Sequence, residues 1–109
     1  MRLILASICI VIFGFTAQSQ QAHVNWMTIE EAMAAQADEP RTILMDVYTQ
    51  WCGPCKMMMA STFTNPALIS YLNEKYYAVK FDAESAEPVT FKDQTFSNPG
   101  FNPASRGRN

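Results

Sequence analysis

The clearest strand pattern in the chain is the stretch Thr42–Thr49, which is apolar at nearly every position between its two threonines. A short apolar run of this length favours a β-strand, and its lack of alternation favours a strand covered on both faces of a layered α/β fold. Tyr76–Asp82 is a second predicted strand. Asp46 interrupts the first strand, and a carboxylate there is costly unless it is paired, hydrogen-bonded or protonated. The alternative is a solvated residue at the strand end, but the position of Asp46 six residues before Cys52 favours a functional role.

The segment before the first strand has helical spacing of its apolar residues. Thr28 and Glu31 form a capping-box pattern at its start, and the helix is expected to end at residues 38–40 because the residue before Pro40 avoids helical backbone angles. Trp26 and Met27, just before the cap, are expected to pack this helix onto the sheet.

Two further helices are predicted between the strands. The first follows the Cys-X-X-Cys segment and runs to about Phe63. The second has Asn65 as its cap, Pro66 at its first position and Lys75 near its C-terminal end. Strand, helix and strand in this order predict a right-handed parallel crossover, and therefore an α/β fold.

The composition changes after Asp82, and residues 83–109 are expected to form a tail rich in loops. Residues 89–91 and 94–96 can pair as a small hairpin around Lys92-Asp93. Residues 97–100 predict a turn, and the basic C-terminal end is interpreted as a solvated tail.

Residues 1–19 have the layout of a secretory signal peptide. Arg2 supplies the positive start, an apolar run extends from Leu3 to Phe15, and Ala17-Gln18-Ser19 offers small residues for cleavage before Gln20. The apolar run is shorter than the ~20 residues that span a bilayer, although a retained anchor remains open. We therefore expect a protein that is exported, to the periplasm or elsewhere outside the cytoplasm, whose domain is residues 20–109, with no membrane association after cleavage.

Composition bounds the remaining possibilities. The 109 residues, 49% of them hydrophobic and 17% charged, suffice for one small domain. The formal net charge of −2 gives no electrostatic case for a nucleic-acid partner. Cys9 would leave with the signal peptide, and Ile8 before it argues against lipid attachment. The single histidine, His23, is interpreted as solvent-exposed.

Candidate chemistry is concentrated at Trp51-Cys52-Gly53-Pro54-Cys55. Pro54 suits the first turn of a helix, so Cys52 is expected at or next to the N-cap and Cys55 inside the first turn. The positive end of a helix and a Cys-X-X-Cys spacing both favour a thiolate, which makes Cys52 the predicted nucleophile. Cys55 would then resolve the mixed disulfide. Gly53 would let a substrate backbone approach, and Trp51 would offer an apolar wall beside the attacking sulfur.

Other uses of the two cysteines fit less well. A zinc site needs about four ligands, which these cysteines and one distant histidine do not supply. Covalent haem attachment needs a histidine after the second cysteine, where Lys56 stands. A purely structural disulfide closing so short a loop would constrain the unfolded chain little. Consecutive methionines 57–59 point to different sides of a helix, so they cannot converge on copper and are interpreted as packing residues.

The stretch from Thr42 to Lys56 resembles the thioredoxin superfamily, and WCGPCK is the most specific part of the match. The resemblance implies that Cys52 and Cys55 are the redox pair, without a bound cofactor. It also implies that Asp46 is the buried carboxylate that assists proton transfer at the resolving cysteine, and that Lys80 is the lysine near it. Tyr48 stands where thioredoxins usually have an aromatic residue. With an export signal, the chain is most similar to periplasmic thioredoxin-like proteins of bacteria.

The resemblance covers roughly Trp26–Asp82, the N-terminal βαβ half of a thioredoxin-like fold. Family members continue with a cis-proline loop, two antiparallel strands and a last helix, which we expect to be missing here, as in a fragment or a product that stops early. Two strands alone would leave an unpaired edge and an uncovered face, and the chain is expected to be marginally stable and prone to associate.

The resemblance implies a thiol–disulfide oxidoreductase that acts on cysteines of exported proteins and is served by an upstream thiol electron donor. Gly53-Pro54 between the cysteines resembles reducing members of the family. The alternatives are a disulfide isomerase, or a redox-silent binding module or inactive truncated product.

Overall fold

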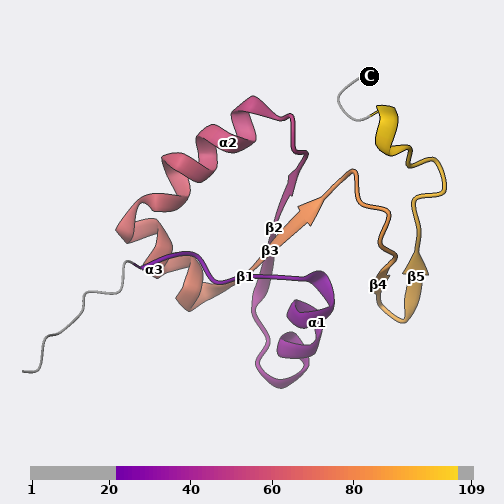
Figure 1. Cartoon of the computed structure of the whole chain (residues 1–109). Helices are drawn as coiled ribbons and strands as arrows, with labels where there is room; N and C mark the ends of the chain where they lie inside the picture. Colours follow the sequence, from indigo (N-terminus) through magenta and orange to yellow (C-terminus); the bar gives the residue numbers. More distant parts are fainter. Residues whose placement is uncertain (1–21, 106–109) are drawn as a thin grey trace, which may run out of the picture.

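A parallel three-stranded sheet forms the centre of the fold (Figure 1). The computed structural model describes residues 22–105. The strands lie in the order β1-β3-β2, so that β3 is central. Their bounds are Trp26–Met27 for β1, Thr42–Tyr48 for β2 and Tyr76–Asp82 for β3. This arrangement confirms the predicted α/β class and both predicted strands.

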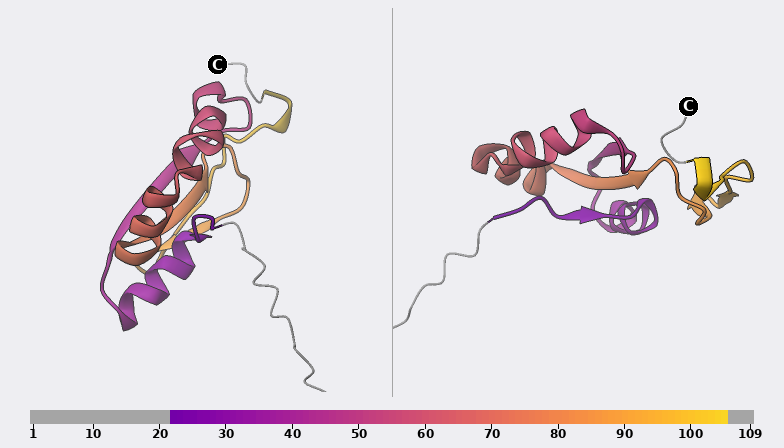
Figure 2. Two further views of the ribbon diagram at one scale, coloured as in Figure 1. Left: turned by 90° about the vertical axis from the view of Figure 1, so that its left-hand side faces the viewer. Right: turned by 45° about the horizontal axis from the view of Figure 1, so that its top comes forward.

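Helices cover the two faces of the sheet. Helix α1, Ile29–Asp38, lies on one face, and α2, Gly53–Ala60, and α3, Pro66–Lys75, lie on the other (Figure 2). Short 3₁₀ turns occupy Thr62–Thr64 and Pro103–Ser105. No helix between residues 22 and 105 combines the length and the apolar character needed to cross a bilayer.

The predicted helix caps are present. Thr28 Oγ1 accepts from the Glu31 amide at 3.2 Å, and the Glu31 carboxylate accepts from the Thr28 amide at 2.8 Å, which completes the capping box. Asn65 Oδ1 accepts from the amides of Ala67 and Leu68, which satisfies two donors that the first turn of α3 would otherwise leave unpaired.

Each face of β3 contributes to its own apolar core, because successive side chains of a strand point to opposite sides. Ala78 packs towards α2 and α3, while Tyr77 and Val79 pack towards α1. The buried residues of the first cluster are Val24, Phe63, Ile69, Leu72 and Ala78, and those of the second are Ile29, Ala32, Tyr77 and Val79. The central strand is thus the one covered on both faces.

Two sequence predictions about the strands were wrong. Two strands were predicted, but Trp26 and Met27 form a third, paired in parallel with β3. A segment of two residues is too short for its periodicity to reveal a strand. Strand β2 is not covered on both faces: Met45 and Val47 are 41% and 54% exposed, because β2 lies at the sheet edge. It also ends at Tyr48, one residue before the predicted end.

The helix after the cysteines is shorter than predicted. It ends at Ala60 instead of continuing to Phe63. Ser61 Oγ donates to the Met57 carbonyl at 2.7 Å, and Thr64 Oγ1 donates to the Ala60 and Ser61 carbonyls. Hydroxyl groups that bond nearby carbonyls in this way compete with the helical ladder, and the chain continues as a 3₁₀ turn.

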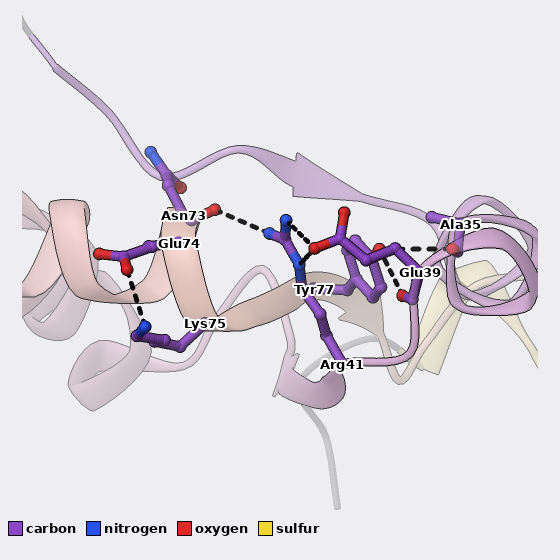
Figure 3. A network of polar contacts seen from close by, with 7 residues as sticks. All are labelled: Ala35, Glu39, Arg41, Asn73, Glu74, Lys75 and Tyr77. Atoms are coloured by element: carbon purple, nitrogen blue, oxygen red, sulfur yellow. Dashed lines mark hydrogen bonds and ion pairs between the residues drawn. The ribbon is translucent and has the colours of Figure 1, made fainter.

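A polar network joins the sheet to α1 and α3 at the amino-terminal ends of β2 and β3 (Figure 3). Arg41 donates to the Glu39 carboxylate at 2.7 Å and to the Asn73 carbonyl at 3.2 Å. The Glu39 carboxylate raises the pKa of Arg41. Tyr77 OH donates to the carbonyls of Ala35 and Glu39. Nearby, Lys75 pairs with Glu74 at 2.7 Å.

The Asn73 side chain holds the segment that leads into β1. Its Oδ1 accepts from the Asn25 amide and its Nδ2 donates to the His23 carbonyl, both at 2.9 Å. His23 itself is exposed, as predicted. The short strand β1 is therefore anchored at its start by a residue of α3.

The predicted hairpin is present as β4, Val89–Phe91, and β5, Gln94–Phe96. Lys92 and Asp93 have positive φ values of 49° and 61°, the backbone that a two-residue hairpin turn of this twist requires. The hairpin is tied to α1 because the Thr90 amide donates to the Glu30 carboxylate at 2.8 Å. This hydrogen bond is the main cause of a lowered pKa at Glu30.

We expect acid to loosen this attachment. A carboxylate whose pKa is lowered in the folded state stabilises that state above its unfolded pKa, and the contribution is lost as pH falls through the folded pKa. The Thr90 amide signal in NMR spectra should therefore titrate with Glu30, at a midpoint below 4.5. Glu30→Gln should abolish this titration, and a titration that persists in the variant would assign it to another group.

The predicted signal peptide, its cleavage site and the basic end at Arg106 and Arg108 lie outside the described residues.

Candidate active site

The two cysteines lie at the start of α2, directly after the turn that follows β2. Cys52 is the N-cap, and its Sγ accepts from the Cys55 amide at 3.2 Å. Cys55 lies in the first turn, and the two are joined by a disulfide with their Cα atoms 5.3 Å apart. Both residues are half-buried. The predicted placement of both cysteines is thereby confirmed, and an N-cap sulfur is the one that the helix N-terminus stabilises best as a thiolate.

Gly53 and Pro54 open the helix. Pro54 lies in the first turn, where its missing N–H removes no helical hydrogen bond. A Cβ atom placed on Gly53 would meet no other atom within 4 Å. The packing of this chain therefore does not require a glycine beside Cys52, and the space in front of it is open.

Asp46 and Lys80 lie opposite each other on neighbouring strands and form an ion pair. Their side chains are only 10% and 22% exposed. The ammonium of Lys80 also lies over two aromatic rings, 4.6 Å from the ring centre of Tyr48 and 5.1 Å from that of Trp26. The predicted carboxylate is therefore paired and largely removed from water, instead of solvated at a strand end.

A hollow of about 520 Å³ opens beside the first turn of α2. Cys55 and Lys80 both line it, together with Tyr48, Thr49, Gln50, Lys56, Met59 and Ala60. Thr49 Oγ1 is buried and has no hydrogen-bond partner among the described residues. The hollow therefore borders both Cys55 and the lysine that pairs with Asp46.

Trp51 directly precedes Cys52 in the chain, and its side chain is 54% exposed. Its indole Nε1 donates to Glu84 Oε1 at 3.1 Å. Glu84 lies in the turn after β3, which is fixed because its own amide donates to Asp82 Oδ1 and the Ala83 amide donates to the Tyr48 carbonyl. The Trp51 indole is thus held from the turn that follows the central strand.

Sequence reasoning missed Glu84 and the contact of Trp26 with Lys80. The position of Glu84 could have revealed it. Glu84 follows one predicted parallel strand and the cysteines follow the other, and the carboxyl ends of parallel strands meet at one edge of the sheet. The sheet order that brings Trp26 to Lys80 depends on β1, which the sequence pattern does not reveal.

Removing the carboxylate of Glu84 should release the Trp51 ring. We expect Glu84→Ala to speed solvent exchange of the Trp51 indole N–H by about fivefold, because one hydrogen bond is worth ~1 kcal/mol. NMR resolves both indole signals, and Trp26 provides the internal reference. Glu84→Gln keeps an acceptor oxygen and should stay close to the native rate; equal exchange in all three proteins would mean that the hydrogen bond does not hold the ring.

Comparison with known proteins agrees with this geometry. A family model named Thioredox_DsbH, described as "Protein of unknown function, DUF255", matches residues 13–97. Thioredoxin-1 of Drosophila yakuba is 32% identical over 80 residues, which cover 73% of this chain and 71% of that protein. The chain belongs to the thioredoxin superfamily. Its thioredoxin-like α/β fold and its Cys52–Cys55 pair are those of a family member.

Other relatives of this thioredoxin-superfamily chain match a smaller part of it. "Thiol:disulfide interchange protein DsbD" of Pectobacterium atrosepticum is 31% identical over 61 residues, 53% of this chain and 11% of that protein. The chain spans 11–12% of the length of the DsbD proteins it matches. No solved structure matches the chain. The thioredoxin relatives and the disulfide support thiol–disulfide redox activity.

Proposed function

We propose that the chain is a thiol–disulfide oxidoreductase that transfers electrons between cysteine pairs of other proteins. The observation that carries the proposal is the Cys52–Cys55 disulfide at the N-terminus of α2, with Cys52 as the N-cap. The names of its relatives, thioredoxin and thiol:disulfide interchange protein, support the same chemistry.

In the proposed mechanism the Cys52 thiolate attacks a substrate disulfide. The Cys52 sulfur bonds one substrate sulfur, and the other substrate sulfur leaves as a thiolate. Cys55 then attacks Cys52 Sγ, which forms the Cys52–Cys55 disulfide and releases the second substrate thiol. Two electrons pass to the substrate in total. An upstream dithiol donor would return the pair to its reduced form by the same exchange.

We assign the proton of Cys55 to Asp46 in this mechanism. Cys55 must lose its proton before it can attack, and the hollow it lines also contains the ammonium paired with Asp46. Because Asp46 and Lys80 are largely buried, bulk water competes little for the carboxylate. Trp51 and the open space at Gly53 would receive the substrate chain on the other side of the disulfide.

We further propose that the substrates are exported proteins and that the direction is reduction. The signal-peptide pattern of residues 1–19 supports export, with residues 20–109 as the working domain. The Gly-Pro pair between the cysteines favours reduction. The reduction potential decides the direction: about −270 mV, as in thioredoxin, would support a reductant, whereas about −120 mV would indicate an oxidant or isomerase.

Insulin reduction by dithiothreitol tests the function. The native chain should accelerate insulin precipitation, and Cys52→Ser should fall to the uncatalysed rate because the attacking sulfur is gone. In the full 109-residue chain, Cys9→Ser is the matched control, since it removes the third cysteine and should keep full activity. Activity that survives Cys52→Ser would remove the proposed mechanism, and a folded native chain without activity would favour a redox-silent binding module.

A further inference from the structure

The ammonium of Lys80 has neighbours from both strands beside it. Asp46 of β2 forms the ion pair with it. The ammonium also lies over the rings of Tyr48 of β2 and Trp26 of β1, 4.6 and 5.1 Å from their centres. A cation within about 6 Å of a ring centre is attracted by the negative face of the ring. Because the lysine side chain is still 22% exposed, these rings help to decide whether its ammonium stays on Asp46 or turns towards water.

The register of the sheet places Trp26 and Asp46 on opposite flanks of Lys80. Strands β1 and β2 lie on either side of β3. Trp26 is the partner of Ala78, and Asp46 is the partner of Lys80. Ala78 and Lys80 share one face of the sheet because side chains alternate along a strand, and their partners share that face with them. Trp26 therefore forms a wall behind the lysine, on the flank away from the carboxylate.

The Trp26 ring is itself held in place. It meets the Phe63 ring edge to face, with 4.9 Å between the ring centres and 84° between the planes. Phe63 is buried in the core cluster beneath α3. The segment that leads into β1 is anchored by two hydrogen bonds of the Asn73 side chain. Trp26 is thus a fixed wall, and it does not have to follow the movements of the lysine.

We infer that Trp26 is a positioning residue for thiol–disulfide exchange, which keeps the ammonium of Lys80 on Asp46. The inference rests on the proposed function, in which Asp46 accepts the proton of Cys55. Asp46 is only 10% exposed, and an ionised carboxylate so far removed from water needs its cation close by. With the ammonium turned towards water, the carboxylate would take up a proton of its own and could not accept another.

This role belongs to the second exchange step. In that step the Cys55 thiol gives its proton to Asp46, and the Cys55 sulfur bonds Cys52 Sγ. The bond between Cys52 Sγ and the substrate sulfur breaks, and the substrate sulfur leaves as a thiolate. The first step, attack by Cys52 on the substrate disulfide, needs no proton acceptor at Asp46. Loss of the Trp26 ring should therefore slow resolution of the mixed disulfide and leave its formation unchanged.

Single-turnover reactions of the reduced chain with insulin separate the two steps. Samples stopped with acid and analysed by mass spectrometry give the rates at which the mixed disulfide forms and disappears. Trp26→Leu should lengthen its lifetime roughly fivefold, the size of one partly desolvated cation–π contact. Trp26→Phe keeps a ring and should recover part of the native rate. Tyr76→Leu is the matched control, because it removes a partly buried ring from the same cluster and leaves both rings beside Lys80.

Solvent exchange of the Lys80 ammonium protons, measured by NMR, tests the positioning without any activity. Trp26→Leu should speed this exchange roughly fivefold, and Tyr76→Leu should leave it as in the native chain. Ring-fluorinated tryptophan at position 26 keeps the size of the ring and weakens its negative face. It should also speed the exchange, so the test remains decisive if Trp26→Leu does not fold.

The outcomes separate this inference from the proposed function. Unchanged ammonium exchange with the fluorinated ring would overturn the inference. Faster exchange with an unchanged lifetime of the mixed disulfide would also overturn it, because Lys80 would then not serve the Cys55 step. An equal slowing in Tyr76→Leu would assign the effect to general packing. A native chain that forms no mixed disulfide would instead contradict the proposed function, and this inference would fall with it.

Discussion

Replacing Cys55 by serine is expected to convert the chain into a covalent trap for its substrates. Cys52 keeps its place as the N-cap of α2, so attack on a substrate disulfide should proceed. The mixed disulfide then lacks the thiol that resolves it, and it should accumulate while turnover falls to the uncatalysed level. Non-reducing electrophoresis and mass spectrometry of Cys55→Ser with insulin should detect a one-to-one adduct. Dithiothreitol should reduce its disulfide and separate the two proteins.

The reciprocal variant, Cys52→Ser, is the matched control for the trap. Cys55 lies inside the first turn of α2 and is not the N-cap, so the helix N-terminus stabilises its thiolate less and it should form little adduct. Both variants are best made with Cys9→Ser, which removes the third thiol from the assay. An adduct of equal yield through Cys55 would mean that a substrate reaches this sulfur through the hollow it lines, and the two cysteines would then share the attacking role.

Replacing Lys80 by methionine should cost more stability than any substitution of an exposed charge. Asp46 would remain 10% exposed between strands without its cation. Removing one partner of a buried ion pair costs ~3–5 kcal/mol, a large part of the ~5–15 kcal/mol by which a small domain is folded. Urea unfolding of Lys80→Met should therefore show a much lower midpoint. Lys75→Met, which removes an exposed lysine paired with Glu74, should unfold as the native chain does.

The double variant Asp46→Leu with Lys80→Met separates the charge effect from packing. Because no unpaired charge is left, it should recover most of the lost stability. It should also lose activity if Asp46 accepts the Cys55 proton. The double variant would then be stable but inactive. A loss below ~1 kcal/mol in Lys80→Met alone would contradict the expected cost and indicate that water in the hollow replaces the ammonium.

Elements whose signals are local could be predicted from the sequence. Thr28 with Glu31 and Asn65 with Pro66 mark helix starts by interactions within one turn, and the structure contains both. The hairpin at Lys92-Asp93 is equally local. The 3₁₀ turn before Asn65 was missed because the hydroxyls of Ser61 and Thr64 prevail over an otherwise suitable helical pattern.

Parts of the site that depend on distant segments were only partly predictable. The positions of Cys52 and Cys55 follow from Pro54 and the strand before them, and the resemblance supplied Asp46 and Lys80. The register that pairs those two residues follows from parallel strands that start together at Thr42 and Tyr76. The Trp51–Glu84 hydrogen bond spans 33 residues of sequence, and no local pattern carries it.

The strand order has a consequence for how the chain folds. Within residues 22–105, strands β1 and β2 pair only with β3, which comes last of the three in the sequence. Neither has a partner within the sheet until residues 76–82 have been synthesised. The sheet therefore forms through contacts between residues that are distant in the sequence, and such contacts form slowly. Helix α2 lies between β2 and β3 in the chain and is brought onto the sheet by the same closure. The dithiol therefore gains its neighbours Lys80 and Glu84 only in the step that completes the sheet, and a nascent chain that stops short of β3 would carry the cysteines without the site.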